Sequence, residues 1–247
     1  MILQCQDINK SFNHKPALVD INLQIRKGEI YILLGPNGSG KTTLLKILST
    51  LITPDQGNAS INGHDIISQP RRIKSRIGCV FPDARSFYWR LTVMQNLIFF
   101  GALYGLDSKT CRHRVSTLLR DLNQEALADI PIRNCSSGMR QIVACIRGIL
   151  HDPPILLLDE PTRSLSPEMA DKICNQIHKM SKEQEKTVLM SSHNLLEAEA
   201  LADRLGIIEK GKLLAEGTLE ELIHQSGHLS LNCLSDIYSS FIEQDAS

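Results

Sequence analysis

The sequence predicts an α/β fold with a parallel sheet, an N-terminal antiparallel β subdomain and an inserted α-helical subdomain. Residues 30–34 and 155–158 are continuous apolar runs, and each leads directly into residues typical of turns or functional sites. Such runs are typical of central strands of a parallel sheet, which are buried on both faces. A third run of this kind, 188–190, ends at Ser191, Ser192 and His193.

Residues 19–25 indicate a strand of a different kind. Apolar residues at positions 19, 21, 23 and 25 alternate with Asp20, Asn22 and Gln24. A period of two is typical of a strand with one face on the core and one face in solvent, as in antiparallel sheets. We therefore expect this strand to belong to the antiparallel subdomain.

The stretch between the two longest buried runs is mainly helical in pattern. Apolar residues recur at helical spacing at 111, 115, 118, 119 and 122, and Thr92 with Gln95 has the pattern of a capping box. Ser166 followed by Pro167 predicts the start of a later helix. We expect a core formed by 1–84 and 150–227, a helical insertion at about 85–149, and a short C-terminal extension at 228–247.

Composition and charge argue against several classes of protein. The 27 basic and 27 acidic residues give a formal net charge of zero, so we expect no nucleic-acid partner. The first ten residues lack the apolar stretch of a signal peptide, and the longest apolar run, 97–106, is half of the roughly 20 residues that span a bilayer. Seven scattered cysteines without a CxxC pair are typical of reduced thiols in a cytosolic protein.

Residues 35–42 match the phosphate-loop pattern GxxxxGK[ST] in full. A predicted strand enters this loop and an apolar helix, 43–51, leaves it, which is more than a glycine-rich turn requires. Lys41 would supply positive charge to the phosphates, Thr42 a hydroxyl to Mg²⁺, and the helix N-terminus free N–H groups. The expected nucleotide-binding residues of this loop are Gly35, Pro36, Asn37, Gly38, Ser39, Gly40, Lys41, Thr42 and Thr43.

The apolar run 155–158 ends in two carboxylates, Asp159 and Glu160. An acid at the end of a strand beside a phosphate loop can hold Mg²⁺, and we assign this role to Asp159. Glu160 can polarise the attacking water as a general base. Acid pairs also occur at caps and turns, so this prediction depends on the phosphate loop.

Four motifs in this order and spacing resemble the nucleotide-binding domain of ABC transporters over nearly the whole chain. They are 35–42, the run Ser136-Ser137-Gly138-Met139-Arg140-Gln141, residues 155–160 followed by Pro161-Thr162, and Ser191-Ser192-His193. The form of the second motif and the stretch 91–106 resemble the ABC-2 type, whose members are often exporters. The resemblance implies a RecA-like P-loop NTPase core, ATP and Mg²⁺ as cofactors, and ATPase activity.

The resemblance also implies roles for single residues. Phe12 matches the aromatic residue that stacks on adenine, although a phenylalanine at a strand end can equally be core. Ser136, Ser137 and Gly138 match the signature that contacts ATP bound by a second subunit; an ordinary helix N-cap is the alternative. His193 matches the histidine that contacts the γ-phosphate. The implied catalytic set is Glu160, His193 and Lys41.

Several positions depart from the family pattern. The usual glutamine at the join between core and helical insertion is replaced by Pro82 or Asp83, depending on register. The signature has Cys135 for leucine and Ser137 for its second glycine, and Ser166 replaces the aspartate of the D-loop. An active ATPase is expected, and a non-hydrolysing or weakly active regulatory subunit of a heterodimer stays open as the alternative.

The implied partners are a second ABC ATPase subunit and a membrane permease. One chain carries a P-loop half-site and a signature half-site, so two subunits related by a two-fold axis would bury two ATP molecules. The permease is expected to dock near 83–91, where Phe87, Tyr88 and Trp89 cluster, although these aromatics could equally be core. The expected location is cytoplasmic, on the inner face of the membrane through the permease, and the expected direction is export.

A soluble ABC ATPase of DNA repair or translation is the remaining alternative. Relatives of that kind carry long coiled coils or two cassettes in one chain, and neither pattern is present in this sequence. The transported substrate cannot be predicted, because the path for cargo lies in the permease. Homodimer and heterodimer are both compatible with the sequence.

Overall fold

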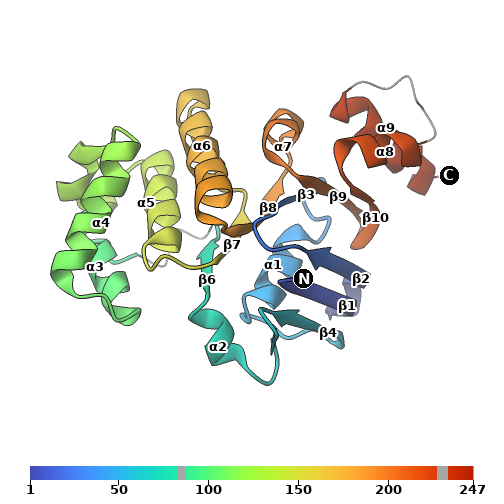
Figure 1. The fold of residues 1–247 in the computed structure, drawn as a ribbon, viewed down its shortest axis with the longest axis horizontal. Helices are drawn as coiled ribbons and strands as arrows, with labels where there is room; N and C mark the ends of the chain where they lie inside the picture. The colour runs from blue at the N-terminus through green and yellow to red at the C-terminus, as the bar shows by residue number, and fades with distance from the viewer. Residues whose placement is uncertain (83–86, 227–232, 247) are drawn as a thin grey trace.

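The computed structural model describes residues 1–82, 87–226 and 233–246, and its described residues form two sheets with helices between and around them (Figure 1). The larger sheet has six strands in the order β10-β9-β3-β8-β7-β6. Five of them run parallel, and β10 pairs antiparallel with β9 at one edge. Their bounds are β3 Ile30–Leu34, β6 Ile77–Val80, β7 Ile155–Asp159, β8 Thr187–Ser192, β9 Arg204–Glu209 and β10 Lys212–Gly217.

The large sheet separates two hydrophobic cores, which explains its continuous apolar runs. In β3, Ile30, Ile32 and Leu34 face the core shared with the outer helices, whereas Tyr31 and Leu33 face the core shared with the smaller sheet. β7 divides its residues in the same way. Every residue of both strands is buried. The predicted α/β fold with a parallel sheet buried on both faces is therefore confirmed.

The smaller sheet is antiparallel, in the order β2-β1-β4-β5, and lies at the lower right of Figure 1. Its strands are β1 Leu3–Phe12, β2 Lys15–Ile25, β4 Gln56–Ile61 and β5 His64–Asp65. The alternation predicted for β2 holds from Ile21 to Ile25 but is wrong before it, because Leu18 is buried in place of Val19. Asp20 has φ 48°, and the register against β1 shifts there. The side chains before and after this bulge therefore alternate in opposite phase.

Helix α1, Lys41–Leu48, lies between the two sheets (Figure 1). Leu44, Leu45, Ile47 and Leu48 are buried in the same core as residues of both sheets. The predicted helix 43–51 ends earlier than expected, because Thr50 adopts φ 60° after the C-cap at Ser49. The loop that leads into α1 is therefore held at the carboxyl end of β3.

Among the described residues between β6 and β7, the chain forms three α-helices and two 3-10 helices, and the α-helices lie at the left of Figure 1. The capping box is confirmed: Gln95 N donates to Thr92 Oγ1 (3.2 Å) and Thr92 N donates to Gln95 Oε1 (2.9 Å). These helices are α3 Val93–Leu103, α4 Ser108–Asp121, η2 Glu125–Asp129, η3 Ile132–Asn134 and α5 Ser137–Ile149, while the short α2, Pro70–Lys74, precedes β6.

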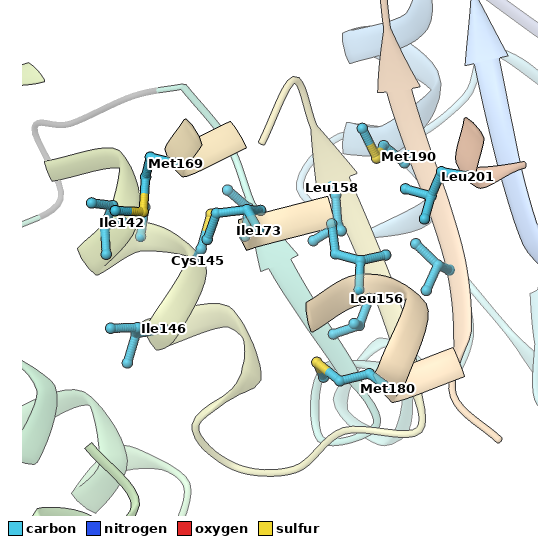
Figure 2. Packing of buried hydrophobic residues seen from close by; sticks show 14 of the residues in the cluster. Ile142, Cys145, Ile146, Leu156, Leu158, Met169, Ile173, Met180, Met190 and Leu201 are labelled. Atoms are coloured by element: carbon cyan, nitrogen blue, oxygen red, sulfur yellow. The ribbon is translucent and has the colours of Figure 1, made fainter. Parts of the chain in front are cut away.

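Helix α6, Pro167–Gln184, connects this helical region to the large sheet. Figure 2 shows the shared core running from Ile142 and Cys145 of α5, through Ile173 of α6, to Leu158 of β7. The predicted start is confirmed, with Ser166 at the N-cap and Pro167 at the first helical position. The Ser166 side chain, however, makes no capping hydrogen bond.

The C-terminal residues end in a helix that the sequence analysis did not predict. After α7, Leu195–Leu201, and α8, Leu219–Ser226, the chain forms α9, Leu234–Ala246, at the right of Figure 1. Leu234, Ile237 and Phe241 of α9 are buried in the core of the outer helices, and α9 contacts α7, α8, β9 and β10. Residues 234–242 therefore pack on the core.

Two findings concern the predicted environment of the protein. Of the helices in the described ranges, none is both long enough and apolar enough to cross a membrane. All seven cysteines are free thiols, and Cys5, Cys111, Cys135 and Cys145 are buried.

Candidate functional site

The loop between β3 and α1 is packed so closely that two of its glycines cannot carry a side chain. A Cβ on Gly35 would lie 2.2 Å from the carbonyl oxygen of Ile208, and a Cβ on Gly40 would lie 2.6 Å from that of Ala17. Gly40 also has φ 110°, a conformation that other residues rarely adopt. The loop therefore presents backbone close to the surface of the sheet, as a cradle for a bound group requires.

Lys41 lies at the start of α1 and is only 5% exposed. Its Nζ donates to the carbonyl oxygens of Gly35 (2.7 Å) and Pro36 (2.8 Å), which holds the ammonium across the loop. Burial lowers the pKa of Lys41, and the nearby carboxylates of Glu160 and Asp159 oppose this shift. A buried ammonium next to exposed backbone N–H groups suits an anion.

Asp159 lies at the end of β7 and faces α1. Its Oδ2 accepts a hydrogen bond from Thr42 Oγ1 (2.8 Å), and its Oδ1 accepts one from Ser191 Oγ (2.6 Å). The carboxylate is almost fully buried. Parallel pairing of β7 with β8 sets Asp159 directly opposite Ser191, so the sheet itself brings the two together.

Glu160 is held in place through both its backbone and its carboxylate. Its φ is 46°, and its N–H donates to Ser191 O (3.2 Å) and Ser191 Oγ (3.1 Å). Its Oε1 lies 3.1 Å from His193 Nδ1, and its Oε2 lies 3.6 Å from an Arg163 nitrogen. The Glu160 side chain is 9% exposed, whereas those of His193 and Arg163 are 58% and 56% exposed. A buried carboxylate thus faces two cationic or polarisable groups at the surface.

Lys41, Asp159, Glu160 and Arg163 meet at one cavity of about 160 Å³, whereas His193 lines a neighbouring cavity. The first cavity has the phosphate loop on one side and the end of β7 on the other. Its lining residues are Ala17, Asn37, Gly38, Gly40, Lys41, Thr42, Thr43, Pro82, Asp159, Glu160 and Arg163.

The residues around this cavity fit a nucleotide phosphate with a divalent cation. Ser39 Oγ is buried without a hydrogen-bond partner among the described residues, so the loop retains an unused polar atom. Thr42, Asp159 and Ser191 supply hydroxyl and carboxylate oxygens, which are the ligands that Mg²⁺ prefers. Thr42 and Asp159 are the residues that could hold the cation.

The signature residues lie away from that cavity. Ser136 caps α5, with its Oγ accepting from Met139 N (3.1 Å), and Ser136 and Ser137 are exposed. Gly138 packs closely on the D-loop, because a Cβ there would lie 2.8 Å from Ser164 O. Ser137 lines a second cavity, of about 270 Å³. The cap interpretation thus holds for Ser136, and its hydroxyl remains at the surface.

The predicted aromatic residues divide between core and surface. Phe12 is 47% exposed, with Lys10 Nζ 5.5 Å from its ring centroid, and it does not line the phosphate-loop cavity. Phe87 is buried, whereas Tyr88 and Trp89 are exposed. Pro82 lines the cavity, and Asp83 lies outside the described residues.

Three residues at the site were not predicted to act there. Ser191 holds Asp159 and the backbone of Glu160, Arg163 faces the carboxylate of Glu160, and Gln141 donates to Pro161 O (2.9 Å). Ser191 was recognisable as the residue that ends an apolar strand. Gln141 ends the signature motif and Arg163 directly follows Pro161-Thr162, but neither position indicates a contact with Glu160 or Pro161.

Comparisons with known proteins identify the family. A family model described as ABC transporter matches residues 18–163. The chain belongs to the ABC transporter family. Residues 18–163 cover the phosphate loop, the signature and both carboxylates, whereas Ser191 and His193 lie beyond the matched range. The resemblance to ATP-binding proteins of ABC exporters is confirmed, and the chain is an ABC-type ATPase.

Curated relatives of this ABC protein match along most of the chain. The ABC transporter ATP-binding protein NatA of Bacillus subtilis is 36% identical over 92% of this chain and 93% of its own length. The Nod factor export ATP-binding protein I of Bradyrhizobium diazoefficiens is 32% identical over 99% of this chain and 78% of its own. The daunorubicin resistance ATP-binding protein DrrA3 of Streptomyces coeruleorubidus is 34% identical over 88% and 68%.

Solved structures agree with this assignment. An ATP-binding subunit of an ABC transporter superposes with a TM-score of 0.87 at 27% identity, covering 98% of this ABC protein and 100% of that chain. A dimeric ATP-binding cassette in a post-hydrolysis state, bound to ADP and Pi, gives 0.81 at 27% identity, covering 88% and 98%. The fold of this ABC ATPase is thus one that binds nucleotide in related proteins.

Proposed function

We propose that this ABC ATPase hydrolyses MgATP at the interface of two ATP-binding subunits and thereby powers export through a separate membrane permease. The observation that carries the proposal is the position of Glu160. Its carboxylate lines the phosphate-loop cavity and lies between His193 and Arg163. The catalytic core comprises 1–84 and 150–227, and about 85–149 form the helical insertion.

Different residues of the cavity would bind the phosphates, hold the cation and accept the proton. When bound, MgATP supplies a γ-phosphoryl group and a cation that neutralises its charge. Lys41 and the N–H groups of the loop bind the phosphates, and Thr42 with Asp159 would hold the cation. Glu160 accepts the proton of the attacking water, while His193 holds the Glu160 carboxylate in orientation through Oε1.

Adenine binding and dimer formation involve surfaces at the edge of this site. Phe12 is exposed at the end of β1, where its ring could stack on a base. Ser136 caps α5, and Ser137 and Gly138 are the first residues of the helix. The hydroxyl groups and the partial positive charge of this helix start suit a phosphate bound by the other subunit. We propose that two chains, alike or different, bury two ATP molecules in this way.

The membrane partner is proposed to contact the exposed aromatics near residues 83–91. Tyr88 and Phe99 pack edge to face with ring centroids 4.7 Å apart, and Trp89 is exposed nearby in the chain. Large aromatics that remain in water are common at protein interfaces. The chain would then lie on the cytoplasmic face of the membrane, bound through its permease.

ATPase activity of the purified chain with Mg²⁺, measured beside Glu160→Gln, tests the catalytic proposal. We expect hydrolysis by the wild type and a loss of at least about a hundredfold in the variant, because the general base is removed. Glu199→Gln, an exposed acid of α7, is the matched control and should keep wild-type activity. If wild type and Glu160→Gln both bind ATP and are equally inactive, the chain is a non-hydrolysing regulatory subunit, and the proposal that it hydrolyses ATP is wrong.

Size measurement in solution tests the dimer. Glu160→Gln with ATP should form a dimer that ADP does not support, and Ser136→Glu should prevent it by placing a negative charge against the phosphate.

Deletion of the permease tests the transport role. Loss of the membrane-bound fraction of this chain would support that role. No membrane-bound fraction with the permease present would favour a soluble ABC ATPase, and an unchanged fraction after the deletion would contradict docking through that permease.

A further inference from the structure

Arg163 occupies an unusual place beside the proposed general base. The turn 160–163 is closed by the N–H of Arg163 donating to Glu160 O (3.1 Å), and it directs the guanidinium back onto Glu160 Oε2 at 3.6 Å. Because His193 lies against Oε1, both oxygens of the carboxylate already have a partner. An attacking water would have to compete with one of them.

The same side chain borders three cavities. Arg163 lines the phosphate-loop cavity, the cavity next to Ser137, and a larger one of about 870 Å³ beside His193. None of the other described residues that line these cavities borders all three. The side chain is 56% exposed, so it can change partners with little loss of packing.

Charge around the phosphate-loop cavity favours such a change. Among its described lining residues the cations are Lys41 and Arg163, and the anions are Asp159 and Glu160. A polyphosphate adds several negative charges to this balanced set. Because Lys41 is buried and bonded to the loop, Arg163 is the cation that can move toward the added charge.

We propose that Arg163 is a positioning residue that restrains Oε2 of Glu160 and transfers to the polyphosphate when nucleotide fills the cavity. The general base is then released only in the loaded site. This inference rests on the proposed function of the same cavity. It also implies that Glu160 and the nucleotide compete for one guanidinium.

This competition predicts that substitutions of Arg163 and Glu160 have non-additive effects on nucleotide affinity. In the wild type, part of the attraction between Arg163 and the phosphates is lost in separating Arg163 from Glu160. In Glu160→Gln that competitor is weakened, so removal of Arg163 should cost more affinity. A double-mutant cycle on binding measures this difference without requiring hydrolysis.

The experiment is an equilibrium titration with a fluorescent β,γ-imido ATP analogue and Mg²⁺. The proteins are wild type, Glu160→Gln, Arg163→Gln and the double variant, all at one protein concentration. Arg112→Gln removes one exposed positive charge on α4, away from the cavity, and is the matched control. Thermal unfolding of each protein without nucleotide checks that the variants are folded.

We expect Arg163→Gln to raise the Kd roughly fivefold in the wild-type background and clearly more in the Glu160→Gln background. Arg163→Lys should recover part of the affinity, since it keeps the charge. Arg112→Gln should leave the Kd unchanged. In turnover, Arg163→Gln should raise KM and leave kcat near the wild-type value, because Glu160 is free of Arg163 in the loaded site of both proteins; loss of a simple surface ion pair would not change KM.

An equal Kd for wild type and Arg163→Gln in folded proteins would overturn the inference, as would equal losses in the two backgrounds. Lys41→Ala separates this failure from that of the proposed function. If the wild type binds the analogue and Lys41→Ala does not, the nucleotide site stands whatever Arg163 does. If neither protein binds, the proposed function itself fails.

Discussion

The side chain of Gln141 hydrogen-bonds to the backbone directly after Glu160. Gln141 Nε2 donates to Pro161 O at 2.9 Å, with Glu160 O at 3.5 Å, and the amide is buried. Gln141 belongs to α5, the helix that Ser136 caps. A hydrogen bond therefore connects α5 directly to the turn 160–163, which carries the proposed general base Glu160. We expect a movement of α5 to displace this turn.

Gln141→Ala tests this link. The variant leaves a buried carbonyl oxygen of Pro161 without its donor, so the free energy of unfolding should fall by about 1–3 kcal/mol. The ATPase rate should fall as well, because the turn at 160–163 loses a restraint. Chemical denaturation and steady-state hydrolysis are the measurements, with Gln184→Ala, an exposed site at the end of α6, as the control. Full activity in Gln141→Ala would show that the two elements act independently.

Gly40→Ala is expected to abolish nucleotide binding without unfolding the protein. A methyl group would lie 2.6 Å from Ala17 O at a φ of 110°, a combination of clash and strain that costs about 1–3 kcal/mol. The loop must shift to relieve it, and the cradle is lost. Gly63→Ala, also at positive φ but in open space, should cost stability alone. Binding of labelled ATP and thermal unfolding separate the two effects, and tight binding by Gly40→Ala would contradict the cradle.

Asp152→Asn should remove part of the acid sensitivity of the protein. The hydrogen bond from Lys186 lowers the pKa of Asp152 below its ordinary value of 3.8 in the folded state. This pair therefore contributes stability above pH 3.8, and the contribution is lost as the pH falls through the lowered pKa. Asparagine tolerates the φ of 58° at this position.

Urea denaturation over a series of pH values checks this expectation. Wild type should be more stable than Asp152→Asn at neutral pH, and the difference should shrink below pH 3.8. Asp121→Asn, an exposed acid at the end of α4, is the control. A difference that stays constant across the acid range would mean that the ion pair is not the cause.

Phe241→Ala tests whether α9 is part of the folded core. Phe241 is 8% exposed and joins the core of the outer helices, so its truncation should cost about 3–5 kcal/mol if α9 unfolds together with the rest. Ser239→Ala, exposed on the same helix, should change stability little. A single transition that moves to lower denaturant would support one core, whereas an unmoved transition would show that α9 detaches independently.

The parts of the site that lie at strand ends could be predicted from the sequence. β3 and β7 are continuous apolar runs because each faces two cores, and the residues after them must then lie at one edge of the sheet. Lys41 and Asp159 therefore come together from positions far apart in the chain. Pattern and position are sufficient there, because the parallel pairing leaves little freedom.

Features that depend on local backbone conformation could not be predicted. Arg163 reaches Glu160 because Glu160 adopts φ 46°, an uncommon conformation for glutamate. Leu18 is buried in place of Val19 because of a bulge at Asp20, and the alternation of apolar residues alone does not reveal this bulge. α9 was missed, although its buried residues Leu234, Ile237 and Phe241 have the spacing of one helix face.

The burial of α1 between the two sheets determines which part of the molecule can respond to ATP. A helix with leucine and isoleucine side chains engaged on both sides cannot tilt or slide without opening a core. Its amide hydrogens should accordingly exchange with solvent only through global unfolding. The base of the nucleotide site is thus held rigidly between the two sheets. We therefore expect any movement on ATP binding to involve the helices outside it.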